Sequence, residues 1–212
     1  MSTWSIVLAA GSGRRYDPVV LKQYEKIGPW RVVDLSMERA RTVSEGVVLV
    51  VGAEFAEDDE PLADVVVVGG DRRSDSVRRG LDAVPEDCDI VVVHDGARPL
   101  ASSELFEAVI EAVLAGADAA IPGLAVTDTI KQIDDEGCVI GTLDRDDLVA
   151  VQTPQAFRAK VLRRAHQDEP DATDDAALVE SVGGIVVVVP GEQTNLKITT
   201  RHDLSVAHLH VQ

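Results

Sequence analysis

Short runs of apolar residues, rich in valine and isoleucine and nearly free of polar ones, recur along the whole chain. The runs cover residues 5–9, 46–51, 65–68, 90–94, 119–122 and 185–189. A strand with one face in water alternates apolar and polar residues, whereas a strand buried on both faces does not. The pattern therefore predicts a mostly parallel sheet that is covered by helices on both sides.

Helical patterns separate these runs, at residues 33–42, 75–83, 103–115, 158–166, 174–182 and 201–210. Thr173 and Thr200 are suitable N-caps for the last two of them. Strands and helices in regular alternation are typical of an α/β domain. The chain has 212 residues and no repeat or linker that we can recognise, so we expect residues 1–212 to form one such domain.

One segment departs from this alternation. Residues 127–133 and 138–143 are both strand-like, and the sequence Asp134-Asp135-Glu136-Gly137 between them suits a hairpin turn. A hairpin inserted into a parallel sheet usually projects from it, so we expect an arm at about residues 126–148. The apolar side of this arm would be covered either by a second copy of the chain or by its own domain.

The chain is strongly acidic, with 37 acidic residues, 20 basic residues and a formal net charge of -17. Such a chain repels polyanions, which argues against nucleic acids and membrane surfaces as partners. No apolar run approaches the roughly 20 residues that cross a bilayer, and the first residues do not resemble a signal peptide. The two cysteines, Cys88 and Cys138, fit no metal-binding spacing. These features predict a cytoplasmic protein.

The first apolar run leads into a loop with the sequence Leu8-Ala9-Ala10-Gly11-Ser12-Gly13-Arg14-Arg15. Glycines let backbone amides approach a phosphate closely, and Arg14, Arg15 and Lys22 supply positive charge nearby. Loops at the carboxyl ends of parallel strands are where such sheets bind ligands. The loop therefore predicts a phosphate site, with a plain tight turn as the alternative. Tyr16 stands where a dinucleotide fingerprint needs its third glycine, and the Gly-Lys-Ser/Thr ending of a P-loop is missing.

Two further loops follow apolar runs. Residues 69–76 open a helix, so their amides and hydroxyls either bind a base or a ribose, or only cap that helix. Asp95 and Arg98 follow the fourth run. Asp95 is a candidate to order a metal or to accept hydrogen bonds from substrate hydroxyls, and Arg98 is a candidate to bind a phosphate. The alternative is that the two form a structural ion pair.

Two later features complete the set of candidates. Thr153-Pro154-Gln155 follows the hairpin and either belongs to the site or is a rigid turn. Lys197 lies inside an apolar, strand-like segment. A lysine there is costly unless it is paired or solvated, which favours a functional role over a chance surface position.

Seven motifs of the chain, taken in order, resemble those of the 2-C-methyl-D-erythritol 4-phosphate cytidylyltransferase family. They are Leu-Ala-Ala-Gly-Ser-Gly-Arg-Arg with Lys22-Gln23-Tyr24, Gly-Gly-Asp-Arg-Arg-Ser-Asp-Ser-Val, Val-His-Asp-Gly-Ala-Arg-Pro, Asp128-Thr129-Ile130-Lys131, Thr-Pro-Gln-Ala-Phe, Thr173-Asp174-Asp175-Ala176 and Asn-Leu-Lys-Ile-Thr. Each motif is modest alone, but the ordered set covers nearly the whole chain. Enzymes of this family make CDP-methylerythritol from CTP and methylerythritol phosphate in the non-mevalonate isoprenoid pathway.

The resemblance implies a Rossmann-like nucleotidyltransferase fold, CTP and a sugar-alcohol phosphate as substrates, Mg²⁺ held mainly by the CTP phosphates, and a homodimer joined through the hairpin arm. It also implies roles for single residues. Those that would bind cytidine and its triphosphate are Ala9, Ala10, Gly11, Gly13, Gly70, Asp71, Ser76 and Ala97. The catalytic cations around the phosphates would be Arg15, Lys22 and Lys197. Asp95, Arg98 and Thr129 would position the acceptor, and Arg145 would reach from the arm into the partner's site.

The residue types agree with the chemistry of such a transfer. An acceptor phosphate oxygen attacks the α-phosphorus of the nucleotide, which requires alignment and charge neutralisation more than acid–base catalysis. The acceptor phosphate is already ionised at neutral pH, so the reaction needs no general base.

Three alternatives stay open at this point. Cytidylyl transfer to ribitol 5-phosphate or another polyol phosphate would share the nucleotide half, and the region of Thr127, Thr129 and Arg145 would distinguish it. A non-catalytic nucleotide sensor would be expected to lose Lys22 or Lys197, and both are present. A nicotinamide-dependent dehydrogenase is disfavoured by the absent third glycine.

Overall fold

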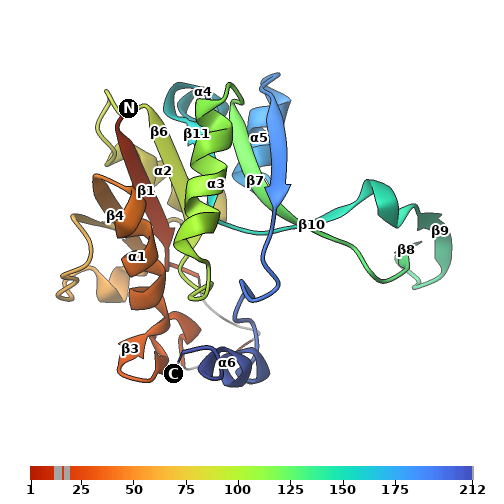
Figure 1. Cartoon of the computed structure of the whole chain (residues 1–212), viewed down its shortest axis with the longest axis horizontal. Helices are drawn as coiled ribbons and strands as arrows, with labels where there is room; N and C mark the ends of the chain where they lie inside the picture. Colours follow the sequence, from red (N-terminus) through yellow and green to blue (C-terminus); the bar gives the residue numbers. More distant parts are fainter. Residues whose placement is uncertain (12–15, 17–19, 212) are drawn as a thin grey trace.

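The computed structural model describes residues 1–11, 16 and 20–211, and its main sheet has the strand order β10-β7-β11-β6-β1-β4-β5, with β12 also paired to β7 (Figure 1). The strands are β1 (Thr3–Leu8), β4 (Gly46–Val51), β5 (Val65–Val68), β6 (Ile90–Asp95), β7 (Ala119–Ala125), β10 (Val149–Val151), β11 (Gln155–Arg158) and β12 (Val186–Pro190). The central strands β5, β4, β1 and β6 are parallel, and β12 is parallel to β7. Only β10 and β11 run antiparallel to their neighbours within this sheet. The predicted mostly parallel sheet is confirmed.

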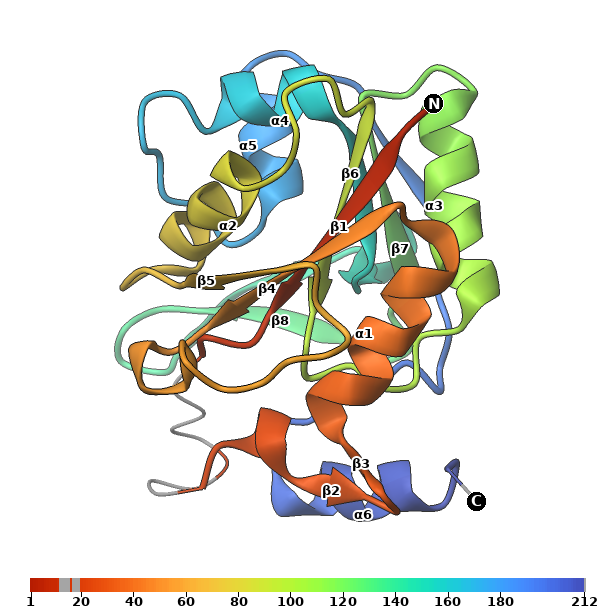
Figure 2. The ribbon, with the colours of Figure 1, turned by 90° about the vertical axis from the view of Figure 1, so that its left-hand side faces the viewer.

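Helices cover both faces of the sheet, as Figure 2 shows. One face carries α1 (Val32–Val43) and α3 (Ser103–Leu114), and the other carries α2 (Arg73–Asp82), α4 (Ala159–Ala165) and α5 (Asp175–Ser181). The last helix, α6 (Arg201–His208), lies apart from the sheet beside two short strands, β2 (Lys26–Ile27) and β3 (Trp30–Arg31). All six predicted helices are present, and their ends differ from the predicted ones by no more than two residues. Among the described residues, no helix combines the length and the apolarity that crossing a membrane requires.

One predicted helix cap is wrong. The N-cap of α5 is Asp174, whose carboxylate accepts a hydrogen bond from the amide of Ala177 at 3.0 Å, and not Thr173. The same carboxylate also accepts a hydrogen bond from Nε2 of Gln155 at 3.0 Å, so a tertiary contact favours Asp174 over its neighbour. The predicted cap of α6 is confirmed, because Thr200 Oγ1 accepts a hydrogen bond from the amide of Asp203.

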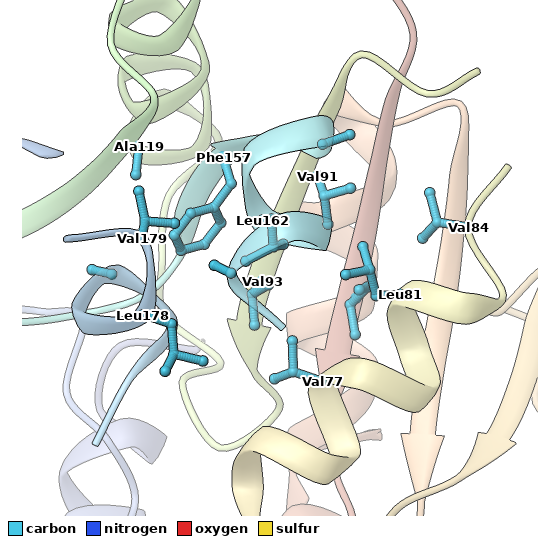
Figure 3. Packing of buried hydrophobic residues seen from close by; sticks show 14 of the residues in the cluster. Val77, Leu81, Val84, Val91, Val93, Ala119, Phe157, Leu162, Leu178 and Val179 are labelled. Carbon is cyan, nitrogen blue, oxygen red and sulfur yellow. The ribbon is translucent and has the colours of Figure 1, made fainter. Parts of the chain in front are cut away.

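The apolar runs are continuous because each strand packs against helices on both sides. In β4, Val48 and Val50 face the cluster beneath α2, α4 and α5, whereas Val47 and Leu49 face the cluster beneath α1 and α3. Figure 3 shows the first of these clusters from close by, with side chains of the sheet and the covering helices in contact. Burying the two faces removes apolar surface from water, which stabilises the fold by about 25 cal/mol for each Å² buried.

The predicted hairpin is present and projects from the domain (Figure 1). It consists of β8 (Ile130–Ile133) and β9 (Val139–Leu143), and its turn includes Gly137 at a φ of +82°, which favours glycine. The arm does not fold back onto its own domain, so its apolar side chains stay exposed. The large exposed ones on the hairpin and on the adjoining β10 are Ile133, Val139, Ile140, Leu143, Val149 and Val151.

His94, in β6, is fully buried beside the ring of Phe106. Its Nδ1 lies 3.1 Å from Thr153 Oγ1 and its Nε2 lies 3.1 Å from the carbonyl oxygen of Arg98, so both ring nitrogens have protein partners. Burial lowers the pKa of His94 to about 4. The ring is therefore neutral at physiological pH and holds the loop after β6 in place.

We expect the free energy of unfolding to depend on His94 in mildly acidic solution. Between about pH 6.5 and pH 4, His94 is protonated in the unfolded chain but stays neutral in the native protein. The free energy of unfolding therefore falls with the pH, by up to about 3 kcal/mol. Above the unfolded pKa of about 6.5, His94 is neutral in both states and the protein keeps its full stability. Denaturant unfolding of the wild type and of His94→Gln from pH 7.5 to 4.5 measures the effect. The pH dependence should be shallower in the variant, and equal slopes would contradict the assignment.

Candidate active site

A cavity of about 610 Å³ opens at the carboxyl ends of β1, β5 and β6. The chain passes from β1 outward to β4 and β5 and then returns to β6 on the opposite side of β1. Such a reversal of strand order leaves a crevice that binds ligands in open α/β sheets. The residues that line it are Leu8, Ala9, Ala10, Gly11, Tyr16, Lys22, Gln23, Gly70, Asp71, Arg72, Arg73, Ser76, Asp95, Ala97, Lys197 and Thr199.

The loop after β1 forms one wall of this cavity and is fixed by a buried glutamine. Gln23 lies in the short 3-10 helix η1 (Lys22–Tyr24) and is only 3% exposed. Its Nε2 donates hydrogen bonds to the carbonyl oxygens of Ala9 at 2.7 Å and Gly11 at 3.1 Å. These two hydrogen bonds fix the backbone conformation at the start of the loop, where it lines the cavity.

Replacing Gln23 with alanine is expected to raise the KM for the substrate that this cavity binds about tenfold. The change leaves two carbonyl oxygens at the loop without their donor, a cost of about 1–3 kcal/mol. Steady-state kinetics at varied concentrations of that substrate measures the KM. Ile27→Val is the matched control, because Ile27 is buried nearby and does not line the cavity. Equal KM values in Gln23→Ala and the control would show that this contact does not shape the site.

The turn at residues 69–76 forms the facing wall, and its two glycines allow close packing. A Cβ on Gly69 would overlap the Cβ of Ala10 and the Oγ of Ser76, so this position needs glycine. Ser76 Oγ accepts a hydrogen bond from the amide of Gly70 at 3.1 Å. Asp75 also accepts a hydrogen bond from the amide of Arg72 at the start of α2, so the turn both caps a helix and lines the cavity.

Asp95, at the end of β6, is surrounded by three cations. Its Oδ2 lies 2.7 Å from Lys197 Nζ and 3.8 Å from Arg98 Nε, and its Oδ1 lies 3.9 Å from Arg73 Nε. Burial alone would raise the pKa of Asp95, but the charges of Lys197 and Arg73 outweigh it and hold the pKa well below its usual range. The carboxylate is therefore charged, and its closest cationic partner is Lys197 rather than Arg98.

The segment that carries Lys197 is held by a buried polar network. Asn195 is fully buried, and its Nδ2 donates to the carbonyl oxygen of Thr153 at 2.9 Å. Arg98 Nη1 donates to the carbonyl oxygen of Asn195 at 2.7 Å. On the other side of Lys197, the amide of Ile198 donates a hydrogen bond to the carbonyl oxygen of Ala97 at 2.8 Å. These contacts hold Lys197 beside Asp95 with little freedom of its backbone.

Lys22 meets the same segment from the other side of the cavity. Its Nζ donates a hydrogen bond to the carbonyl oxygen of Ile198 at 2.5 Å. Two cationic side chains from distant parts of the sequence, Lys22 and Lys197, thus border one cavity and are tied to one backbone segment.

The structure brings most of the sequence-predicted site residues together. Every predicted nucleotide-binding residue that it describes lines the cavity, namely Ala9, Ala10, Gly11, Gly70, Asp71, Ser76 and Ala97. Lys22, Lys197 and Asp95 line it too, whereas Arg98 lies behind Asp95. Gly13 and Arg15 lie outside the described residues.

Thr129 and Arg145, like Arg98, do not line this cavity. Both lie on the projecting arm, Thr129 just before β8 and Arg145 in the 3-10 helix η3 (Arg145–Asp147). Arg145 Nη1 donates a hydrogen bond to the carbonyl oxygen of Thr127 at 2.6 Å, which fastens the two sides of the arm base.

Sequence reasoning assigned no role to several residues of the cavity wall. Gln23 and Arg73 are the most informative. Each lies within a quoted motif, Gln23 directly after Lys22 and Arg73 two residues after Asp71. Their partners, Ala9 O for Gln23 and Asp175 for Arg73, are distant in sequence, so only the motif itself could have indicated them.

The family model of 2-C-methyl-D-erythritol 4-phosphate cytidylyltransferase matches residues 3–212. The chain belongs to this cytidylyltransferase family. A curated 2-C-methyl-D-erythritol 4-phosphate cytidylyltransferase of Rhodococcus jostii is 43% identical over 98% of this chain and 94% of its own length. A bifunctional enzyme IspD/IspF of Solidesulfovibrio magneticus is 40% identical over 97% of this chain and 56% of its own length. The chain thus spans a little more than half the length of such bifunctional relatives.

Solved structures of the same cytidylyltransferase family share the fold. The 4-diphosphocytidyl-2C-methyl-D-erythritol synthase of Anaerococcus prevotii superimposes with a TM-score of 0.83 at 32% identity, covering 100% of this chain and 98% of that one. The 2-C-methyl-D-erythritol 4-phosphate cytidylyltransferase of Thermus thermophilus gives a TM-score of 0.82 at 32% identity, covering 97% and 96%. The predicted nucleotidyltransferase fold of this cytidylyltransferase family is therefore confirmed over the whole chain.

Proposed function

We propose that the chain transfers the cytidylyl group of CTP to 2-C-methyl-D-erythritol 4-phosphate, giving CDP-methylerythritol and pyrophosphate, in the non-mevalonate isoprenoid pathway. Membership of the cytidylyltransferase family supports this reaction. The observation that carries it is the convergence of Lys22 and Lys197 on one segment beside Asp95, in a cavity walled by the two glycine-containing loops.

In this reaction an oxygen of the acceptor phosphate attacks the α-phosphorus of CTP, and the bond from that phosphorus to the bridging oxygen of the leaving pyrophosphate breaks. Negative charge grows on the transferred phosphoryl group and on the leaving oxygen. Lys22 and Lys197, which line the cavity, and Arg15, which lies outside the described residues, are the cations that we assign to this charge. Positive groups aimed at developing charge stabilise it strongly. His94 supplies no base, because its two ring nitrogens are occupied by Thr153 and the Arg98 carbonyl.

We expect Mg²⁺ to be held mainly by phosphate oxygens of the nucleotide, and the residues of the cavity fit that expectation. Among the described residues, no three His, Cys, Asp or Glu side chains are arranged to hold a metal ion. Asp95 is already surrounded by cations, so Asp71 is the cavity carboxylate that would face the metal. Mg²⁺ there would neutralise triphosphate charge and orient the pyrophosphate leaving group.

We also propose that the chain works as a homodimer whose arms complete the sites of the partner subunits. The exposed apolar side chains of the arm are unusual for a surface that only meets water. Thr129 and Arg145 lie on the arm, which projects from the domain (Figure 1), and they do not line the cavity of their own chain. A second copy of the chain could receive them. We further expect the protein to work in the cytoplasm, because Cys88 and Cys138 are free thiols, as is usual in a reducing compartment.

The test is pyrophosphate release from the purified protein with CTP and Mg²⁺, run with 2-C-methyl-D-erythritol 4-phosphate and, in parallel, with ribitol 5-phosphate. Release with the first acceptor alone is the expected result. Release with ribitol 5-phosphate alone would keep the mechanism and overturn the proposed acceptor. No release with either from a protein that binds CTP would favour a nucleotide sensor.

A further inference from the structure

A buried carboxylate behind the cavity has no role in the reaction described so far. Asp175, the first residue of α5, is 1% exposed. Its Oδ2 accepts a hydrogen bond from Arg73 Nη1 at 2.6 Å, and its Oδ1 accepts one from His166 Nε2 at 3.0 Å. The helix does not need Asp175 as a cap, because Asp174 fills that position. The contacts that Asp175 makes with its side chain are therefore those to Arg73 and His166.

Arg73 is the arginine that pairs with this carboxylate, with Nη1 2.6 Å from Oδ2. His166 Nδ1 is buried without a hydrogen-bond partner among the described residues. His166 Nε2 lies 3.0 Å from Asp175 Oδ1 and donates to it. Burial would raise the pKa of Asp175, but the hydrogen bond from His166 and the charge of Arg73 lower it overall. A buried carboxylate without a cation is strongly destabilising, so Asp175 and Arg73 hold each other in place.

Arg73 reaches from this buried carboxylate into the cavity. Its side chain is 28% exposed and lines the wall, and its Nε lies 3.9 Å from Asp95 Oδ1. Lys197 binds the other oxygen of Asp95. The planar guanidinium therefore lies between two carboxylates, with its orientation fixed by the deeper one.

The balance of charge shows what Arg73 adds. Around Asp95 and Asp175 stand three cations, Arg73, Arg98 and Lys197, which leaves a net charge of +1. Without Arg73 the two carboxylates would cancel the two remaining cations. A phosphate dianion that enters beside Asp95 therefore meets a more positive field when Arg73 is present.

We propose that Asp175 and His166 are positioning residues for Arg73, and that Arg73 orients Asp95 and attracts the phosphate of the acceptor. The inference rests on the proposed transfer to a polyol phosphate. Arg73 acts on the acceptor side because it faces Asp95. Most of the proposed nucleotide-binding residues lie instead on the two glycine-containing loops, and Ala97 alone of the described ones follows β6.

Steady-state kinetics with CTP and 2-C-methyl-D-erythritol 4-phosphate varied in turn provides the test. Arg73→Gln should raise the KM for the acceptor about tenfold to a hundredfold, the loss expected for a hydrogen-bonded charge, and change the KM for CTP less than about threefold. Asp175→Asn should shift the same KM in the same direction by a smaller factor. Arg73→Lys should bind the acceptor more tightly than Arg73→Gln and less tightly than the wild type. Lysine keeps the positive charge but lacks the planar guanidinium that can donate to two groups at once.

Val179→Ala is the control, because Val179 is buried in the same helix α5 and does not line the cavity. It should lower the melting temperature and leave both KM values unchanged. An Arg73→Gln or Asp175→Asn protein that behaves like this control would overturn the inference while leaving the proposed function intact. If the wild type releases no pyrophosphate with the acceptor, the proposed function fails, and the inference fails with it.

Discussion

Replacing Lys197 with alanine is expected to lower kcat about a hundredfold to a thousandfold with CTP and methylerythritol phosphate, while the protein stays folded. The estimate follows the usual cost of removing one positioned donor that stabilises charge in a transition state. Lys197 carries no part of the hydrophobic core, and its segment is fixed through Asn195 and Ile198, whose contacts the substitution leaves in place. Arg73 and Arg98 remain beside Asp95, so the protein should fold with a modest loss of stability, and the large loss should fall on turnover.

Single-turnover rates of pyrophosphate release, with melting temperatures measured alongside, provide the check. The control is Lys160→Ala, because Lys160 is an exposed lysine on α4 and does not line the cavity. Its turnover should match the wild type. If folded Lys197→Ala protein keeps a kcat within about threefold of the wild type, Lys197 has no catalytic role and serves only to pair with Asp95.

Mixing two inactive variants is expected to restore about a quarter of the wild-type activity. One variant is Lys197→Ala, with a damaged cavity, and the other is Arg145→Ala, with a damaged arm. If each arm serves the partner's cavity, a hybrid dimer has one cavity with an intact Lys197 and an intact incoming Arg145. About half of the dimers formed at random are hybrids, and each has one working site.

The recovery distinguishes two arrangements of the arm. If Arg145 served the cavity of its own chain, every site in the hybrid would carry one defect and no activity would return. The variants are unfolded together and refolded, and each variant treated in the same way alone is the control. Sedimentation of the mixture should show dimers. Recovery of activity without dimers would contradict the proposed exchange of arms.

Much of the fold could be predicted from local pattern, because parallel strands between two helical layers are apolar throughout. The runs at 46–51 and 65–68 coincide with β4 and β5 for this reason. The antiparallel strand β11 gave no such signal, since Ala156 and Phe157 are its only apolar residues. The two-residue strands β2 and β3 are likewise too short to show any periodicity.

The candidate site could be predicted as far as its motifs follow strands. The loops after β1, β5 and β6 meet at the cavity because parallel strands end at the same edge of the sheet. Pairings across the sequence could not be predicted in this way. Arg73 and Asp175 are 102 positions apart, and nothing local distinguishes Asp175 from the neighbouring Asp174 that caps the helix.

The bond from Lys22 to the carbonyl of Ile198 joins residues 176 positions apart, and it bears on how the protein is made. During synthesis on the ribosome, β1, β4, β5 and β6 emerge early and can begin to pair before the later residues exist. A nascent chain that has reached β12 still lacks the segment that anchors Lys22 and carries Lys197. If the proposed transfer is correct, half-made chains consume no nucleotide, because the site is complete only when the late segment has joined the early one.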